Sequence, residues 1–136
     1  MGSRTKSRRK AAEILYEADI RADSIAETLS RVRSQGLGTY NEFTLEIVEG
    51  VHSNLSSIDD IINTYSEGWK IDRMPSLDKA LARIGVFELL FRDDIPDEAS
   101  ISEVVSLAGE MSTEQSPQFL NGLLAKISSV RNRIVL

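Results

Sequence analysis

The apolar side chains of this chain recur every three or four residues over almost its whole length. This spacing places them on one face of an α-helix, whereas a half-buried strand would need strict alternation. The widest apolar face belongs to one segment and comprises Leu77, Ala80, Leu81, Ile84, Phe87, Leu90 and Phe91. We therefore predict an all-α, single-domain bundle of about seven helices, with this segment at its centre.

Local signals predict where the helices begin. Three pairs have the spacing of a capping box, in which a hydroxyl accepts a helix-start amide: Ser24–Glu27, Thr39–Glu42 and Ser100–Glu103. Ser116 followed by Pro117 predicts the start of the last helix, because proline at the first helical position loses no hydrogen bond. Gly50 lies inside a predicted helix and weakens it by up to about 1 kcal/mol, unless a neighbour packs close.

The composition excludes several classes of chemistry. The 136 residues include no cysteine and one histidine, His52, so disulfides and thiol nucleophiles are excluded and any metal site would be carboxylate-rich. No glycine-rich phosphate-binding loop and no serine–histidine–acid set is found. We expect no enzyme activity, catalytic residue, cofactor or metal. No apolar run approaches the roughly 20 residues of a membrane span, and we expect a cytoplasmic protein.

The net charge of −5 hides an asymmetry. The basic N-terminal arm, residues 1–10, contains no acid and carries Arg4, Lys6, Arg8, Arg9 and Lys10, whereas the helical domain, residues 11–136, is acidic. One basic patch on an acidic body suits a phosphate-bearing partner. A disordered, solubilising terminus explains the same charges equally well.

Two segments contain candidate RNA-binding residues. Arg8, Arg9 and Tyr16 can share a side of a helix. This arrangement suits single-stranded RNA, because the cations can bind phosphate and the ring can stack on a base. Alternatively, Tyr16 belongs to the core. Asn121 and Gly122 both lower helix propensity inside an apolar helix. Gly122 could admit a nucleotide, with Asn121 offering its amide to a base, or it could mark a helix crossing.

Six segments, in order along the chain, resemble the NusB family: residues 8–17, 68–75, 77–90, 95–96, 101–108 and 116–124, the last containing Phe119-Leu120-Asn121-Gly122. Ala82, Ser102 and Gly109 depart from the family's usual leucine, asparagine and lysine. The resemblance implies two three-helix halves plus a short extra helix. It also implies transcription antitermination in ribosomal RNA operons, through binding of boxA-type single-stranded RNA together with ribosomal protein NusE, in a complex with RNA polymerase.

The resemblance and the charge pattern together give two sets of expected site residues. The RNA-binding set is Arg4, Lys6, Arg8, Arg9, Tyr16, Phe119 and Asn121. The protein-partner set, on the central helix, is Asp78, Arg83 and Glu88, whose acidic groups would meet a basic ribosomal protein. We expect Arg8→Ala with Arg9→Ala to lower the salt slope of RNA binding by about 2, with little effect on folding because the arm should be exposed.

Two other functions remain open at this point. The same helical domain precedes the catalytic domain of some ribosomal RNA cytosine methyltransferases. A protein-only scaffold or dimerisation module is the second alternative, and both a monomer and a homodimer are compatible with the sequence. RNA binding must weaken steeply with salt, whereas an apolar dimer should not.

Overall fold

The computed structural model describes residues 2–34 and 41–136. These residues form seven α-helices and two short 3-10 turns, Ile71–Arg73 and Arg131–Arg133, with no strand among them. The helices are α1 (Ser3–Ile20), α2 (Ile25–Ser34), α3 (Glu42–Ser53), α4 (Leu55–Tyr65), α5 (Ser76–Phe91), α6 (Asp97–Met111) and α7 (Ser116–Val130). The all-α prediction is confirmed.

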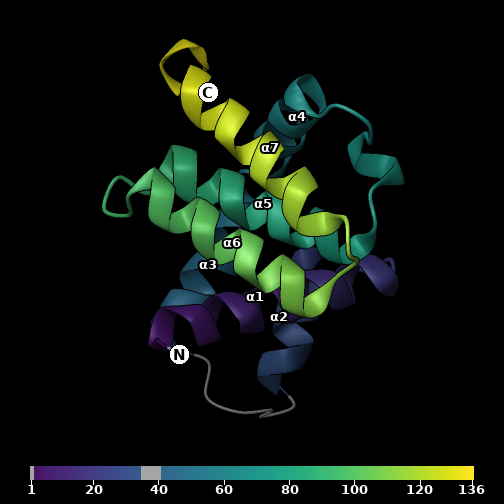
Figure 1. Ribbon diagram of the computed structural model, residues 1–136. Coiled ribbons are helices and arrows are strands. Elements are labelled where there is room, and N and C mark those ends of the chain that lie inside the picture. The colour runs from purple at the N-terminus through teal and green to yellow at the C-terminus, as the bar shows by residue number, and fades with distance from the viewer. Residues whose placement is uncertain (1, 35–40) are drawn as a thin grey trace.

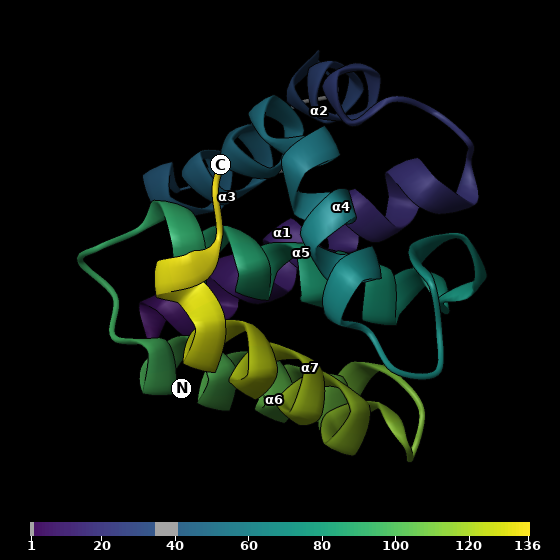
Figure 2. The ribbon, with the colours of Figure 1, turned by 90° about the horizontal axis from the view of Figure 1, so that it is seen from above.

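Helix α5 lies at the centre of the bundle, as predicted, and contacts α1, α3, α4, α6 and α7 (Figure 1). Helices α6 and α7 run together along one side of it, and α2 and α3 lie on the other side (Figure 2). Leu81, Ile84 and Leu89 of α5 are almost completely buried because they face neighbours all round the helix. The arrangement is two three-helix groups, α1–α3 and α5–α7, with α4 between them.

The predicted helix-capping residues are found at some helix starts and not at others. The Ser24 hydroxyl accepts a hydrogen bond from the Glu27 amide at 3.0 Å, as predicted. Helix α3 is capped by the Asn41 side chain, which accepts from the Thr44 amide, and Thr39 lies outside the described residues. Helix α7 begins at Ser116, one residue before the predicted Pro117, so Ser116 is not the cap residue and its hydroxyl donates to Asp78 instead.

The predicted capping box at Ser100 is wrong. Helix α6 already begins at Asp97, because Pro96 sets an extended backbone before it and Asp97 and Glu98 place negative charge in its first turn. Ser100 is therefore a buried residue inside the helix, and its hydroxyl donates to Glu88 of α5 at 2.7 Å.

Gly50 of α3 and Gly122 of α7 differ in the space around them: Gly50 is tightly packed, and Gly122 is not. A Cβ added at Gly50 would lie 2.1 Å from Cε1 of Phe87, so this glycine allows α5 to pack close against α3. A Cβ at Gly122 would meet nothing within 4 Å. The expectation of a helix crossing at Gly122 is therefore wrong, and this glycine faces open space.

Candidate nucleic-acid interface

The basic arm is the first part of α1, which begins at Ser3. Its cations are therefore distributed around a helix, and the surroundings differ between its sides. Lys6 and Lys10 are exposed, and Arg9 is half-buried. Arg8 is only 3% exposed. The side of the helix on which each residue lies decides what it can bind.

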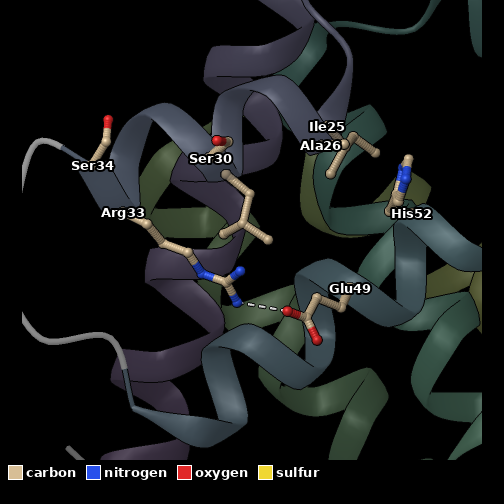
Figure 3. Close-up of a pocket in the computed structure, with 8 residues that line it drawn as sticks. Ile25, Ala26, Ser30, Arg33, Ser34, Glu49 and His52 are labelled. Carbon is tan, nitrogen blue, oxygen red and sulfur yellow. Dashed lines mark hydrogen bonds and ion pairs between the residues drawn. The ribbon is translucent and has the colours of Figure 1, made fainter.

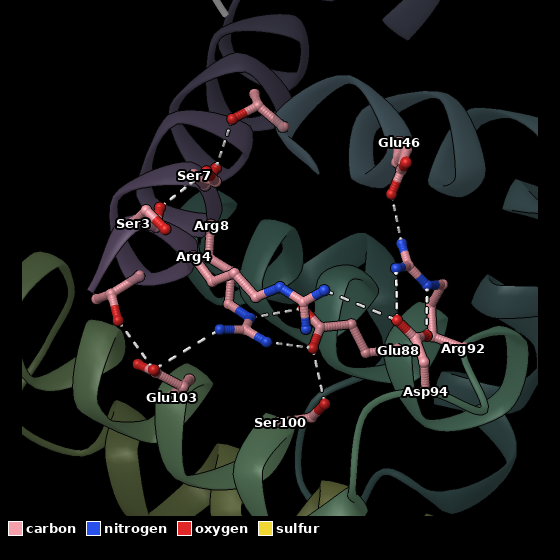
Figure 4. Close-up of polar contacts among 12 residues, drawn as sticks. Ser3, Arg4, Ser7, Arg8, Glu46, Glu88, Arg92, Asp94, Ser100 and Glu103 are labelled. Atoms are coloured by element: carbon pink, nitrogen blue, oxygen red, sulfur yellow. Dashed lines mark hydrogen bonds and ion pairs between the residues drawn. The ribbon is translucent and has the colours of Figure 1, made fainter. Parts of the chain in front are cut away.

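Arg8 is the centre of a buried polar network that joins α1, α5 and α6 (Figure 4). Its guanidinium donates two hydrogen bonds to the Glu88 carboxylate, Nε to Oε2 at 2.7 Å and Nη2 to Oε1 at 2.9 Å. Ser100 donates to the same carboxylate, and Glu103 lies 3.6 Å from Nη1 of Arg8. Thr5 in turn donates to Glu103 at 2.9 Å.

The expectation that Arg8 is exposed is therefore wrong. Arg8 precedes Ala12 by four residues and Leu15 by seven, so it lies on the core-facing side of α1. The structure places its charge against Glu88, which is completely buried. In this arrangement Arg8 is not available to phosphate, and its role is to hold α1 on α5.

Arg4 lies one turn before Arg8 on the same side of α1, over the ring of Phe43 in α3. The guanidinium carbons of Arg4, Arg8 and Arg92 lie 4.7, 5.3 and 5.4 Å from the centroid of this ring. Asp94 accepts two hydrogen bonds from Arg92, which hold the pKa of that carboxyl down at about 2, and it lies 3.8 Å from Arg4. Glu46 also accepts from Arg92. Carboxylates therefore already surround the cations at this end of α1.

The exposed side of α1 carries the remaining basic side chains and an aromatic ring. Arg9 forms an ion pair with Glu110 of α6, and both side chains remain partly exposed. Tyr16, seven residues further on, lies on the same side and is 37% exposed, so the core alternative for this residue is wrong. Ile20 follows one turn later and is 59% exposed.

Phe119 and Asn121 lie on opposite flanks of α7. Phe119 packs edge-to-face on Trp69, with ring centroids 5.2 Å apart. It lines a groove of about 530 Å³ between α4 and α7 together with Tyr65, Glu67, Gln115, Gln118, Gly122, Leu123 and Lys126. Asn121 instead borders a shallow depression between α6 and α7. The structure therefore does not bring these two residues into one pocket.

The three residues expected to meet a protein partner are mostly covered. Asp78 and Glu88 are completely buried, so the expectation that their charges form a docking surface is wrong. Asp78 accepts hydrogen bonds from Ser116 at 2.7 Å and from Ser112. Arg83 donates two hydrogen bonds of 2.9 Å to Asp59 of α4, and its side chain is 13% exposed.

A further hollow of about 490 Å³ lies between α2 and α3 (Figure 3). Its walls include Leu29 and His52, and Arg33 donates to Glu49 across it at 2.6 Å. None of the expected site residues lies there. In residues 2–34 and 41–136, no group of three or more metal-ligating side chains gathers, and no helix has the length and apolar character needed to cross a bilayer.

Comparison with known proteins matches residues 5–129 to the model of the NusB family. The transcription antitermination protein NusB of Pseudarthrobacter chlorophenolicus is 45% identical over 131 residues, which cover 96% of each chain. That of Thermobifida fusca is 47% identical, over 93% of this chain and 89% of its own. The T. maritima NusB structure has a TM-score of 0.80, 31% identity and coverage of 94% of this chain and 92% of its own. A crystal structure of antitermination factors NusB and NusE with double-stranded RNA shares the fold, with a TM-score of 0.79, 24% identity and coverage of 93% and 96%.

Proposed function

The chain belongs to the NusB family, and from this membership we propose that it binds boxA-type single-stranded RNA together with ribosomal protein NusE. In that complex it acts as a transcription antitermination factor that promotes read-through by RNA polymerase in ribosomal RNA operons. The observation that carries this proposal is the 45% identity to a transcription antitermination protein over 96% of both chains. Relatives carry this name and not that of a methyltransferase. We assign it no catalytic role and place it in the cytoplasm.

The RNA-binding surface that we propose starts on the exposed side of α1. Lys6, Arg9 and Lys10 supply charge for phosphate, and Tyr16 supplies a ring for stacking. Phe119 and Asn121 extend this surface to α7. Because Arg9 is paired with Glu110, RNA must displace an internal carboxylate to bind it. Because Glu110 competes with RNA for Arg9, the protein alone should bind RNA more weakly than its number of basic residues suggests.

The decisive measurement is a salt titration of binding to a fluorescent boxA-like RNA, with and without NusE. We expect salt-sensitive binding that NusE strengthens, and weaker binding to a scrambled RNA of the same length. A folded protein that binds neither RNA, with or without NusE, would refute the RNA-binding role and leave the protein-only scaffold as the better account.

Removing the exposed charges tests the α1 surface. Lys6→Ala with Lys10→Ala should weaken RNA binding and lower the salt slope by about 1.4, which is the value for two phosphate contacts to a single strand. The control removes two exposed charges elsewhere, Arg21→Ala with Arg133→Ala, and should change the slope little. Equal slopes for both double variants would mean that Lys6 and Lys10 do not contact phosphate.

Glu110→Gln should have the opposite effect. It removes the carboxylate that pairs with Arg9 and leaves a neutral side chain of the same size. RNA affinity should rise, because Arg9 no longer has to leave a carboxylate before it contacts phosphate. The salt slope should stay nearly the same, because the number of phosphate contacts does not change. The same titration measures both quantities. An unchanged affinity would mean that Arg9 does not contact the RNA.

Tyr16→Ala distinguishes two uses of the exposed α1 side. Exposed apolar residues often contact protein partners, and Tyr16 lies one turn from the exposed Ile20. If Tyr16 stacks on RNA, affinity should fall by about the same factor with and without NusE. A loss seen only in the presence of NusE would assign Tyr16 to the protein partner.

A further inference from the structure

We propose that two uncharged polar contacts hold the basic arm as a helix before RNA arrives. One joins Thr5 to Glu103 of α6, and the other joins Ser7 to Asn41 of α3. These four are positioning residues, because they order the cations of the arm and do not bind the phosphates themselves. This inference rests on the proposed function and assigns the residues that present the α1 surface to RNA.

The arm needs such contacts, because its own sequence does not favour an ordered helix. Residues 2–10 contain no apolar side chain, so the arm has no hydrophobic face with which to pack on the bundle. Gly2 provides no side-chain cap, the first turn of α1 carries no acidic residue, and Lys6 and Lys10 are like charges one turn apart. A terminal segment of this kind frays unless other elements hold it. It is nevertheless helical from Ser3 onward.

Ser7 connects the arm to the start of α3. It is only 2% exposed, although both of its neighbours in sequence are charged. The Asn41 side-chain amide donates to the Ser7 hydroxyl, and the Thr44 hydroxyl donates to the Ser7 carbonyl oxygen at 3.1 Å. The oxygen of the same Asn41 side chain accepts from the Thr44 amide at 3.0 Å. One asparagine therefore caps α3 and holds α1 against it.

Thr5 connects the arm to α6 on the opposite flank. Its hydroxyl donates to the Glu103 carboxylate at 2.9 Å (Figure 4). Thr5 and Ser7 are two residues apart, so their side chains point about 200° apart around the helix. The remaining side of the arm carries Lys6 and Lys10, which are four residues apart and both exposed. The two contacts therefore leave these lysines facing solvent in a fixed arrangement.

An arm that is already ordered should bind phosphate more tightly than a disordered arm of the same charge. A disordered segment loses conformational freedom when it binds, and this cost weakens the complex. The number of phosphate contacts, and with it the salt slope, is the same in both cases. Loss of a positioning residue should therefore lower the affinity and leave the salt slope unchanged, whereas loss of a phosphate contact changes both.

Thr5→Val with Ser7→Ala tests the proposal, because it removes both contacts and keeps every cation. It does not lower the helix propensity of the arm, since valine is similar to threonine and alanine exceeds serine. We expect the backbone amides of residues 6–9 to exchange faster with solvent in the free variant and to regain protection in its RNA complex. Affinity for boxA-like RNA should fall roughly tenfold, the cost of ordering about one residue of backbone, with an unchanged salt slope.

The control makes the same two replacements where each hydroxyl bonds only within its own helix, Thr64→Val with Ser129→Ala. Thr64 donates to the carbonyl oxygen of Asp60, and Ser129 donates to that of Lys126. This control should change neither exchange in the arm nor RNA affinity. Thr5→Ser keeps the hydroxyl and should bind RNA as the natural protein does. If the double variant lowers the melting temperature, Thr5→Val alone, at a half-buried position, should show the same changes to a smaller extent.

Unchanged exchange in the arm would overturn the inference, because the two contacts would then not order it. Faster exchange with unchanged affinity would also overturn it, since an ordered arm would not be needed for binding. Weaker binding with a flatter salt slope would mean that phosphate contacts are lost, and the positioning role would be wrong. All three outcomes leave the proposed function intact. If the natural protein binds no RNA, the proposed function fails and the positioning role fails with it.

Discussion

Arg8→Ala should lower the free energy of unfolding by about 3 to 5 kcal/mol, the usual cost of removing one partner of a buried ion pair. The Glu88 carboxylate would remain completely buried, and among the described residues only the Ser100 hydroxyl would still donate to it. Glu103 cannot compensate, because it is also acidic. The expected loss is a large fraction of the stability of a domain of this size.

Urea unfolding followed by circular dichroism measures this effect, with Arg9→Ala as the matched control. Arg9 is the next residue and pairs with a carboxylate that remains exposed, so its removal should change stability by less than about 1 kcal/mol. Arg8→Met with Glu88→Leu removes both charges together and should be far more stable than Arg8→Ala alone. Similar midpoints for Arg8→Ala and Arg9→Ala would contradict the role assigned to the network.

The buried position of Arg8 also changes what the double replacement of Arg8 and Arg9 would measure in an RNA-binding experiment. The double replacement of Arg8 and Arg9 would lose RNA binding by unfolding α1 from the bundle, and its salt slope would not count phosphate contacts. Variants at Lys6, Arg9 and Lys10 avoid this problem, because these side chains reach solvent.

Gly50→Ala should destabilise the protein by about 1 to 3 kcal/mol, although alanine favours helix. The added Cβ would lie 2.1 Å from Cε1 and 2.3 Å from Cζ of Phe87, so the ring must move. Phe87 is 6% exposed and stacked on Phe91, so its movement disturbs the centre of the bundle. The clash therefore outweighs the gain in helix propensity.

Gly122→Ala makes the same chemical change where there is no neighbour, and it should stabilise the protein by about 0.5 to 1 kcal/mol. Thermal unfolding of the two variants against the natural protein measures the contrast. Two shifts of the same sign would mean that the surroundings of these glycines do not decide their effect.

Periodicity and turn chemistry were sufficient to predict the helical bundle and its central helix. The same periodicity also places two charged residues of the buried network on core-facing sides of their helices. Arg8 lies four residues before Ala12 on the core side of α1, and Glu88 lies four residues after Ile84 on the core side of α5. Two opposite charges at core positions of two helices indicate a buried pair. The family resemblance and the charge pattern instead predict an RNA contact for Arg8 and a protein contact for Glu88.

The grouping of the site residues could not be predicted in the same way. Phe119 and Asn121 are two residues apart, yet they face different helices, because two residues on a helix turn the side chain by about 200°. Which helix covers each flank depends on long-range packing. The open space at Gly122 likewise depends on α4 and the Trp69 linker, which lie far from it in the sequence.

The Arg8–Glu88 contact has a consequence for how the chain is made. Its two residues are 80 positions apart, and the Thr5–Glu103 contact spans 98. At a synthesis rate of about 5 to 20 residues per second, Arg8 is made roughly 4 to 16 s before Glu88. During this interval Arg8, on the apolar side of α1, lacks its carboxylate partner, and the Phe43 ring of α3 can cover only part of its guanidinium. The first three helices should therefore not form a stable unit on the ribosome, and folding should wait until α5 and α6 have emerged.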